Sequence, residues 1–558
     1  MPPKPISRNT LFYGDNLPIL REYVPSESVD LVYLDPPFNS NRSYNVLFKD
    51  ESGAASEAQI TAFDDTWHWG PTAEAAYYDL VTDAPAGIAK MISALREFVG
   101  ANQMMAYLVM MAACLVELHR VLKPTGSLYL HCDPTASHYL KIVLDTIFGP
   151  ANFRSEVIWK RTNAHNSAKR WGPIHDVLLF YSKTDNYFWG DIRQEYSSDY
   201  VEKYFKFDDN DGRGFYWTGD LTGSGTRQGD TGKPWKGFDP TLKGRHWAYP
   251  REELDRLDAD RRIFWPKTQG AFPKLKRYLS EAKGIPLQDM VLDVYSMVTM
   301  GSNASESLGY PTQKPLALLE RILQASSNPG DIVLDPFSGC GTAISAAQKL
   351  GRRWIGIDIT HLAIAMHKSR LKDSFSLEPG RDYDVIGEPE DLTAARQLAH
   401  DDRYQFQWWA LSLVRAKPVG GDESSRQGKK GSDRGIDGLI TFIDDPKRKT
   451  QSAIVQVKSG HVKSGDIRDL IGTVQNQEAA FGIFITLEEL TPEMITAASQ
   501  AGFYVSPIWQ EKYPKIQILT ISALLGGASV QMPRFSQAAF KQAPRVKKSE
   551  GEQGELGI

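Results

Sequence analysis

The stretch DIVLDPFSGCGTAISAAQKLGRRWIGIDIT at residues 331–360 decides the fold. An apolar run ends at Asp335, a glycine-containing turn follows, a helical pattern comes next, and a second apolar run ends at Asp358. Strand, turn, helix and strand in this order predict a βαβ unit with two parallel strands. Because strands and helices also alternate earlier in the chain, we expect a doubly wound α/β sheet.

Apolar and amphipathic runs mark the other elements expected around this unit. We expect residues 39–100, which are mixed and polar-rich, to form an insertion over the strand ends, and KPTG at 123–126 to form a turn. The expected strands are 29–34, 127–133, 156–161 and 175–183, and the expected helices are 101–122, 138–148 and 310–327.

The turn within the βαβ unit has the composition of a ligand-binding loop. Gly339 and Gly341 allow the backbone to approach a ligand, and the helix that follows offers unpaired N–H groups to a carboxylate. Asp358, at the end of the next strand, suits a ribose diol. The third glycine of a dinucleotide fingerprint would fall at Ile344, and this departure, with Asp335 directly before the loop, favours S-adenosylmethionine over a nicotinamide cofactor. A purely structural glycine turn is the alternative.

A second motif follows the strand VDLVYL at 29–34, where Asp35, Pro36, Pro37 and Phe38 stand at the carboxyl end. Open α/β sheets place their ligands at such strand ends. A carboxylate and a proline-fixed carbonyl can accept the N–H bonds of an exocyclic base amine, which localises its lone pair. Phe38 offers a face on which an extruded base could stack. The alternative is a turn that only closes the strand.

Together these motifs resemble the β-class amino-DNA methyltransferases, which carry the [DNS]-P-P-[YFW] motif first and the cofactor loop later. The resemblance covers about 1–185 and 306–375. The segments that carry it are FYGDN at 12–16, DPPF at 35–38, YPTQKPLALLERIL at 310–323 and DPFSGCGT at 335–342.

The resemblance implies a Rossmann-like methyltransferase sheet that binds S-adenosylmethionine and double-stranded DNA. It implies catalysis by the Asp35 motif, and an aspartate in that position leans toward N6 of adenine rather than N4 of cytosine. The implied cofactor contacts are Asp15, Thr312, Lys314, Asp335, Phe337, Ser338, Gly339, Gly341, Thr342 and Asp358.

The segment 186–305 lies where this class keeps its target-recognition module. Its tryptophans stand among basic residues, which suits phosphate contacts and base stacking, although an aromatic minor core would explain several of them equally well. The basic candidates are Arg213, Arg227, Lys233, Lys236, Arg245 and His246. The expected domains are 1–185 and 306–375 (methyltransferase), 186–305 (recognition), 376–403 (linker), 404–527 (a second α/β domain) and 528–558 (a disordered tail).

The C-terminal domain has its own candidate site. Asp437 begins one expected strand, and Gln456 and Lys458 lie on the next, so they could converge on one Mg²⁺. This pattern resembles the Mrr-like branch of the PD-(D/E)xK restriction endonucleases, in which Gln commonly precedes x-Lys. The resemblance implies a nuclease with Asp437 and Gln456 as metal ligands, although Gln407 stands where the branch often has Glu. The alternative is an α/β domain in which a lysine happens to lie near an aspartate and no metal site exists.

Composition narrows the setting. The chain has 558 residues, too many for one ordinary core, and its net charge of −4 means that any DNA-binding surface is local. Three cysteines without metal-ligand spacing and the lack of a signal sequence favour the cytoplasm. The apolar run near 104–116 is too short for a membrane span, so no membrane partner is expected. The oligomeric state stays open, with a homodimer as one option.

These observations predict an adenine N6 methyltransferase fused to an endonuclease domain, in restriction–modification or phage defence. An orphan methyltransferase with a degenerate, DNA-binding nuclease fold is the main alternative. Two further alternatives are a nuclease that uses the methylase half to sense sites and a nicotinamide-dependent oxidoreductase.

Overall fold

The computed structural model describes residues 6–37, 43–49, 55–64, 69–163, 169, 171–268, 270–300, 306–308, 310, 312–419, 436–444 and 450–533. For 43–49 and 55–64 it describes the backbone only. The chain divides into two compact units, one formed by 191–288 and the other by the rest.

The larger unit contains a nine-stranded sheet with the order β15-β6-β7-β5-β2-β16-β17-β1-β18. All neighbouring strands pair in parallel except β7, which is antiparallel to β5 and β6. The strands are β1 (Thr10–Tyr13), β2 (Val29–Leu34), β5 (Leu122–Cys132), β6 (Phe153–Lys160), β7 (His175–Ser182), β15 (Met290–Val291), β16 (Ile332–Asp335), β17 (Arg353–Asp358) and β18 (Asp384–Ile386).

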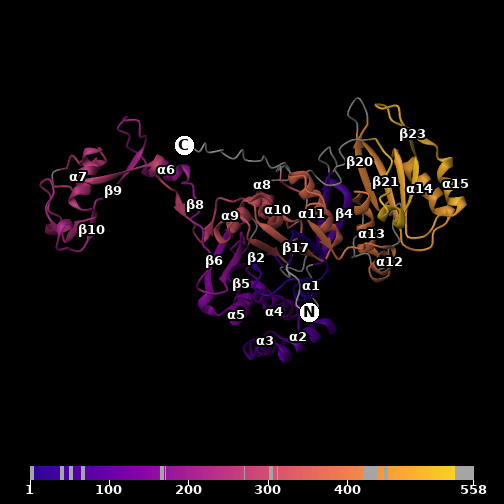
Figure 1. Ribbon diagram of the computed structural model, residues 1–558, viewed down its shortest axis with the longest axis horizontal. Coiled ribbons are helices and arrows are strands. Elements are labelled where there is room, and N and C mark those ends of the chain that lie inside the picture. Colours follow the sequence, from indigo (N-terminus) through magenta and orange to yellow (C-terminus); the bar gives the residue numbers. More distant parts are fainter. Residues whose placement is uncertain are drawn as a thin grey trace, which may run out of the picture. The chain divides into compact units, whose positions relative to one another are not determined.

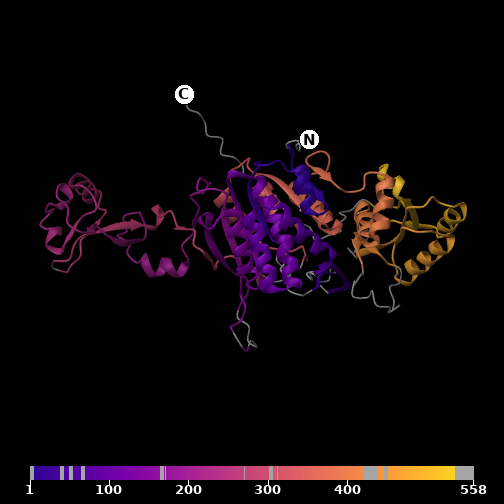
Figure 2. The ribbon, with the colours of Figure 1, turned by 90° about the horizontal axis from the view of Figure 1, so that it is seen from below.

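Helices cover both faces of this sheet, as a doubly wound fold requires (Figure 1). One face packs into an apolar core with helices that include α4, and these purple helices lie in front of the sheet in Figure 2. The other face packs against α9, α10 and α11. The helices are α1 (Asn16–Tyr23), α2 (Pro71–Asp83), α3 (Ala86–Val99), α4 (Gln103–Val121), α5 (Ser137–Phe148), α8 (Met297–Met300), α9 (Leu316–Ser326), α10 (Thr342–Lys349), α11 (His361–Phe375) and α12 (Leu392–Asp401).

Helix α4 is the one helix of the described chain long and apolar enough to cross a membrane, and 67% of its apolar window is buried inside the fold. Its buried side chains belong to the core beneath the sheet, so the prediction of a buried helix is confirmed.

The C-terminal part forms a second α/β sheet with the order β19-β20-β21-β22-β25. Helices α12, α13 and α16 pack on one face, and α14 and α15 on the other. The elements are α13 (Arg403–Leu413), β19 (Lys417–Pro418), β20 (Gly438–Ile443), β21 (Thr450–Lys458), α14 (Ser464–Asn476), β22 (Phe481–Thr486), α15 (Pro492–Gln500), β23 (Phe503–Val505), β24 (Lys512–Pro514), β25 (Ile516–Thr520) and α16 (Ile521–Leu525).

The smaller unit is built from short strands around a minor core. Trp235 and Trp247 are almost fully buried in that core. The alternative interpretation, an aromatic minor core, therefore holds for these two tryptophans. Its elements are β8 (Arg193–Gln194), α6 (Ser198–Tyr204), β9 (Tyr216–Asp220), β10 (Thr222–Ser224), β11 (Arg245–Trp247), α7 (Arg251–Ala259), β12 (Ile263–Phe264), β13 (Lys274–Tyr278) and β14 (Ile285–Pro286).

Most predicted elements form, and four details differ. Residues 123–126 belong to strand β5, with a bulge in its pairing to β2, and are not a separate turn. Helix α9 begins at Leu316 rather than 310, because Pro315 precedes its first turn in extended conformation. The insertion contains the hairpin β3 (Ser43–Lys49) and β4 (Ala55–Asp64) and helices α2 and α3.

The fourth difference concerns the predicted linker at 376–403. Residues 384–386 form β18, which pairs in parallel with β1 at the edge of the large sheet, and 392–401 form α12. The edge of β1 supplies the hydrogen-bond partners that turn this short polar segment into a strand, and the sequence pattern does not show that edge. Of the predicted tail, 534–558 lies outside the described residues.

Candidate functional site

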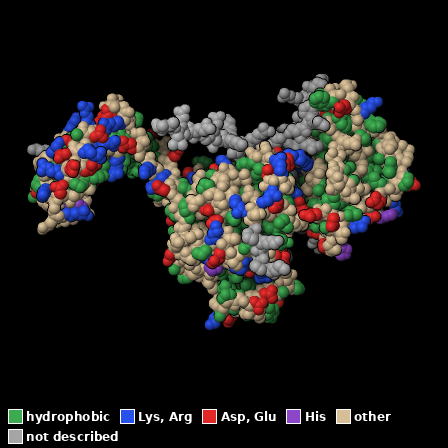
Figure 3. Space-filling view, viewed as in Figure 1, with side chains coloured by type: hydrophobic (Ala, Val, Ile, Leu, Met, Phe, Trp, Pro, Cys, Tyr) green, Lys and Arg blue, Asp and Glu red, His purple; other side chains and the backbone are tan. Residues whose placement is uncertain are grey.

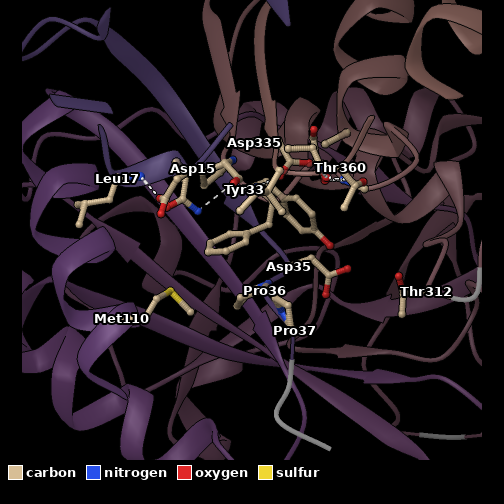
Figure 4. Close-up of a pocket in the computed structure, with 18 of the residues that line it drawn as sticks. Asp15, Leu17, Tyr33, Asp35, Pro36, Pro37, Met110, Thr312, Asp335 and Thr360 are labelled. Atoms are coloured by element: carbon tan, nitrogen blue, oxygen red, sulfur yellow. Dashed lines mark hydrogen bonds between the residues drawn. The ribbon is translucent and has the colours of Figure 1, made fainter. Parts of the chain in front are cut away.

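A cavity of about 510 Å³ opens at the carboxyl ends of β2, β16 and β17. Both sequence motifs contribute to its wall. Figure 4 shows Asp15 on one side of it and Thr312 on the other, with Asp35, Pro36 and Pro37 between them. Residues of α2 and α4 close the cavity with an apolar wall that includes Ala73, Ala76, Ala106, Val109 and Met110.

The glycine loop between β16 and α10 forms one end of this cavity. Gly339 and Gly341 have positive φ angles of 49° and 76°, the left-handed conformation that glycine adopts without strain. Gly341 is the N-cap of α10 and supplies no side-chain cap, so the first turn of α10 has N–H groups for a ligand. Thr342 and Ala343 of that turn line the cavity.

Two side chains of α11 support the loop from below. The guanidinium of Arg370 donates to the carbonyl of Cys340 at 3.3 Å and to Oγ1 of Thr342 at 3.2 Å. The ring of His367 packs under Gly341, where an added Cβ would come within 2.7 Å of it. Sequence reasoning missed both residues, because they stand outside the motif and reach the loop only when α11 folds back.

Two buried carboxyl groups meet beside the loop. Asp358 accepts hydrogen bonds from the Gly339 N–H at 2.8 Å and from the N–H and hydroxyl of Thr360 at 2.9 Å. Burial raises the pKa of Asp358 to about 6. Burial also raises the pKa of Asp335 well above its usual range, and the charges of Asp35 and Asp358 raise it further. A ligand that brings positive charge or hydroxyl donors to this end would favour the ionised forms.

The carboxylate of Asp35 lies on the opposite wall. Its Oδ2 forms an ion pair with the ammonium group of Lys314, whose side chain is only 9% exposed. Its Oδ1 is buried and has no hydrogen-bond partner within the described part of the chain. An acceptor oxygen without a donor is costly to bury, which is typical of a place reserved for a ligand.

Lys314 was predicted as a cofactor contact by resemblance, which stays a prediction, and its ammonium group donates to Asp35. It still lines the shared cavity, as do Asp15, Thr312, Phe337 and Ser338. Asp15 also caps α1 by accepting from the Leu17 N–H at 2.9 Å. Phe38, the expected stacking residue, lies outside the described residues.

Behind Asp35 lies a buried polar group that the motifs did not reveal. Tyr33, which lines the cavity, contacts Nδ1 of His131 through its hydroxyl at 3.0 Å. Nε2 of His131 lies 3.3 Å from Oδ2 of Asp176. The only available signal was polar residues in strands that otherwise read as fully buried, at LHCD in 130–133 and HDVLL in 175–179.

In the C-terminal domain, Asp437 directly precedes strand β20 and Gln456 lies on the neighbouring strand β21, as predicted. Both oxygens of Asp437 already accept hydrogen bonds, from Gln407 Nε2 at 3.0 Å and from the Val457 N–H at 2.7 Å. Gln456 is 7% exposed, and Lys458 ends β21. The described residues contain no group of three or more His, Cys, Asp or Glu side chains that could hold a metal.

This donor set does not fit a nuclease magnesium centre. Mg²⁺ prefers a near-octahedral shell of oxygens that includes carboxylates, and one engaged carboxylate with one neutral amide falls short of that. The metal role of Asp437 and Gln456 therefore stays a prediction, and Oε1 of Gln456 is buried without a hydrogen-bond partner within the described residues.

A doubly wound sheet with a glycine loop and a proline-fixed carboxylate at one cavity defines the class of α/β proteins that bind a ligand at the carboxyl ends of their strands. Residues 29–368 match the DNA methylase family (N6_N4_Mtase), which is more than half of the chain. The chain therefore belongs to this DNA methylase family. Residues 422–526 match NACHT-associated inactive Restriction Endonuclease 1, so the C-terminal domain is restriction-endonuclease-like, and the Mrr-like assignment is not what was matched.

Three relatives extend this comparison. Type II methyltransferase M.EcaI of Enterobacter cloacae is 30% identical over 355 residues, 63% of this chain and 66% of that protein. The StyLTI Mod subunit, from a type III restriction-modification enzyme of Salmonella typhimurium, is 28% identical over 62% of this chain and 50% of its own length. DNA adenine methyltransferase YhdJ of Escherichia coli is 25% identical over 65% of this chain and 82% of its own length. The chain thus spans half to just under two thirds of the first two relatives.

Proposed function

We propose that this protein transfers a methyl group from S-adenosylmethionine to the N6 amine of adenine in double-stranded DNA. One observation carries the proposal: Asp35, whose Oδ1 has no hydrogen-bond partner within the described residues, lines the same cavity as the glycine loop. The methyl acceptor and the methyl donor must meet in one space, and this cavity offers a place for each.

The chain's own residues supply the positioning that such a transfer needs. Asp35 Oδ1 and the carbonyl of Pro36 accept the two N–H bonds of the base amine, which localises the nitrogen lone pair. The ion pair to Lys314 holds the other Asp35 oxygen in place. Pro36 and Pro37 fix the backbone of the turn and add no competing donors. The donor contributes a methyl group on a positively charged sulfur.

The residues at the loop end fit S-adenosylmethionine. Its carboxylate matches the uncapped first turn of α10, its ammonium group matches the buried Asp335, and its ribose hydroxyls match Asp358. The apolar wall of α2 and α4 offers space for less polar parts of the cofactor. The carboxylates at this end disfavour a nicotinamide cofactor, whose pyrophosphate is negative.

Adenine is proposed over cytosine on two grounds. Aspartate stands first in the motif, and one relative is named a DNA adenine methyltransferase. Methylation at N4 of cytosine uses the same chemistry and is the alternative outcome of the assay below.

The compact unit 191–288 is proposed as the target-recognition module. Figure 3 shows basic and acidic side chains interleaved on its visible face. Arg213, Lys236 and Arg245 each pair with an aspartate within the unit. Arg227 is exposed and is the stronger candidate for a phosphate contact. The names of the relatives support a role in restriction–modification, and the cytoplasm is where such DNA lies.

The test combines product analysis with a matched pair of variants. Purified protein is incubated with unmethylated plasmid and labelled methyl donor, and the DNA is digested to nucleosides. We expect labelled N6-methyladenine, a loss of about 10³-fold or more in Asp35→Asn, and unchanged activity in Asp185→Asn, which is surface-exposed. Labelled N4-methylcytosine would overturn the base assignment, and no label from protein that binds the cofactor would overturn the function.

For the C-terminal domain we propose the second candidate, a nuclease fold that binds DNA without cutting it. The observation that favours it is the engagement of both Asp437 oxygens within the fold. We expect intact plasmid when Mg²⁺ is added. Mg²⁺-dependent fragments that disappear in Lys458→Ala would restore the endonuclease prediction.

A further inference from the structure

The buried group behind Asp35 forms a connected path toward the surface. His131 on β5 is fully buried, and its ring meets Tyr33 on one nitrogen and Asp176 on the other. The other oxygen of Asp176 lies 3.4 Å from the guanidinium of Arg161, whose side chain is 42% exposed. On the inner side, Nδ1 of His131 lies 4.0 Å from Oδ1 of Asp35.

As a purely structural contact, this arrangement would cost more free energy of desolvation than an apolar contact. A carboxylate and an imidazole in the middle of a sheet must be desolvated, and an apolar pair of equal volume would be cheaper. The same strand shows what a structural polar contact looks like, since the Tyr129 hydroxyl simply meets the Ser326 hydroxyl at 2.7 Å. His131 differs because it places a group that can gain a proton next to the proposed amine site.

The proposed reaction produces a proton at this place. The amine nitrogen uses its lone pair to form a bond to the methyl carbon, whose bond to sulfur breaks with the electron pair left on sulfur. The nitrogen then carries a positive charge and both of its hydrogens, so one N–H bond must break with its electrons kept on nitrogen. Of the two Asp35 oxygens, Oδ1 has no hydrogen-bond partner within the described residues, whereas Oδ2 is paired with Lys314.

We propose that His131, oriented by Asp176, is a positioning residue that takes over from Asp35 the proton released by the methylated amine. This inference rests on the proposed function. Asp35 Oδ1 receives the proton, and a movement of about 1 Å brings it within hydrogen-bond distance of Nδ1. The imidazolium that forms is balanced by the Asp176 carboxylate at Nε2. After the product leaves, the proton passes back from His131 to Asp35 and from there to water in the cavity.

The resting hydrogen bonds suit this role. Burial raises the pKa of Tyr33 well above its usual range, so its hydroxyl keeps its proton and can donate to Nδ1 in the resting state. This hydroxyl turns away when Asp35 delivers its proton, because Nδ1 has a single lone pair. The ring proton then lies on Nε2 and is donated to Asp176. Burial alone would raise the pKa of Asp176, but the contacts with His131 and Arg161 lower it, which keeps this carboxylate ionised.

The sign of the pH dependence follows from the groups around the ring. Tyr33, Asp35 and Asp176 face His131 directly, and the cations of Arg161 and Lys314 stand beyond the two carboxylates. A neutral imidazole can accept a proton and an imidazolium cannot. The methyl-transfer step should therefore be slower in acid than at neutral pH, with cofactor and DNA saturating.

The test measures single-turnover methyl transfer against pH in full-length protein. We expect about a 10²-fold loss in His131→Asn, which keeps an acceptor for Tyr33 but cannot take up a proton, and about tenfold in Asp176→Asn. Cofactor Kd and KM for DNA should stay within about threefold, and the acid limb set by His131 should vanish in H131N. Tyr129→Phe removes a buried hydroxyl from the same strand and should match wild type.

A second readout does not depend on activity. The side-chain NMR signal of His131, identified by its loss in H131N, should change its chemical shift in Asp35→Asn and in Asp176→Asn, since each change removes a negative neighbour of the ring. If H131N does not fold, D176N and Tyr33→Phe carry the kinetic test.

The possible outcomes separate the two proposals. Wild-type protein without any methyl transfer overturns the proposed function. Wild-type activity with unchanged rates and pH profiles in H131N or D176N overturns only the His131 inference. A His131 NMR signal that is unchanged in D35N also overturns it, because the two groups would then not be in contact.

Discussion

Gly341 shows how much of the site depends on a single backbone position. Its φ of 76° starts helix α10 with its N–H groups facing the cavity, and its missing side chain lets the ring of His367 pack directly underneath. A side chain here meets two separate penalties, the left-handed backbone and the collision with His367.

We predict that Gly341→Ala weakens cofactor binding by roughly tenfold and destabilises the fold by about 2 kcal/mol or more. Gly351→Ala is the matched control, since its φ of 70° is similar but nothing lies within 4 Å of an added Cβ. The control should lose about 1 kcal/mol and keep its cofactor affinity. Calorimetric titration and chemical unfolding measure both, and equal cofactor Kd values in the two variants would contradict the prediction.

Asp358 gives a pH dependence at the same scale. Burial raises its pKa to about 6, so it is mostly ionised at pH 7.5 and half protonated at pH 6. If its carboxylate receives the ribose hydroxyls, cofactor affinity should fall as pH decreases through about 6. Because this pKa is raised on folding, the group's contribution to fold stability has the opposite sign: it is present in acid and lost as pH rises through about 6.

Titration of cofactor binding between about pH 5 and 8 tests this in wild type and in Asp358→Asn. The variant should bind more weakly at pH 7.5 and show a flatter pH profile. A wild-type Kd that stays constant across this range would remove Asp358 from the binding site.

At the scale of elements, helix starts determine where the functional groups lie. Helix α10 begins without a side-chain cap, whereas α1, α11, α12 and α13 each begin with a side chain that accepts an N–H bond. Other helices, among them α2, α5 and α9, also begin without a side-chain cap, but α10 combines this with a glycine loop that lines the cavity. Those four capped starts need no ligand, because the fold satisfies them internally.

Helix α13, which supplies Gln407 to Asp437, offers a test of such a cap. Asp402 accepts from the N–H groups of Tyr404 at 2.9 Å and Gln405 at 3.0 Å. We predict that Asp402→Ala destabilises the start of α13 by about 1 kcal/mol, a factor of about five in local opening. Hydrogen exchange of the α13 amides measures it. Asp401→Ala is the control, since Asp401 caps no helix, and equal exchange in both variants would refute the role of the cap.

At the scale of the whole molecule, the chain forms two compact units. The larger one contains the proposed catalytic site, and 191–288 is the proposed recognition module. Residues 191–288 leave the large unit between two fixed points, where the Gly190 N–H donates to Ala325 at 2.8 Å and the Ile158 N–H donates to Asp289 at 2.7 Å. One end of the insertion is therefore held by helix α9 and the other by strand β6 of the sheet.

We predict that replacing 191–288 by a short glycine-serine linker leaves a folded protein that binds cofactor within about threefold of wild type but no longer methylates DNA. Calorimetric titration and the labelled-methyl assay measure the two properties. Retained methylation of the same sites would show that target recognition lies elsewhere, and loss of cofactor binding would show that the two units are not independent.

The sequence alone was enough to predict the doubly wound sheet, the position of both motifs and a C-terminal α/β domain. It was enough because buried parallel strands are continuous apolar runs, and because Asp35 and the glycine loop each follow such a run directly. Local pattern and local chemistry coincide at these places, so neither needs knowledge of the rest of the chain.

Only the tertiary structure decided which distant side chains complete the site. Lys314 pairs with Asp35, Arg370 and His367 support the loop, and His131 meets Asp176 across neighbouring strands. The pairing of strand β18 with β1 and the hydrogen bond from Gln407 to Asp437 were also decided only by the tertiary structure. Each depends on strand order and helix packing, which bring together residues far apart in the chain and leave no fixed spacing in the sequence.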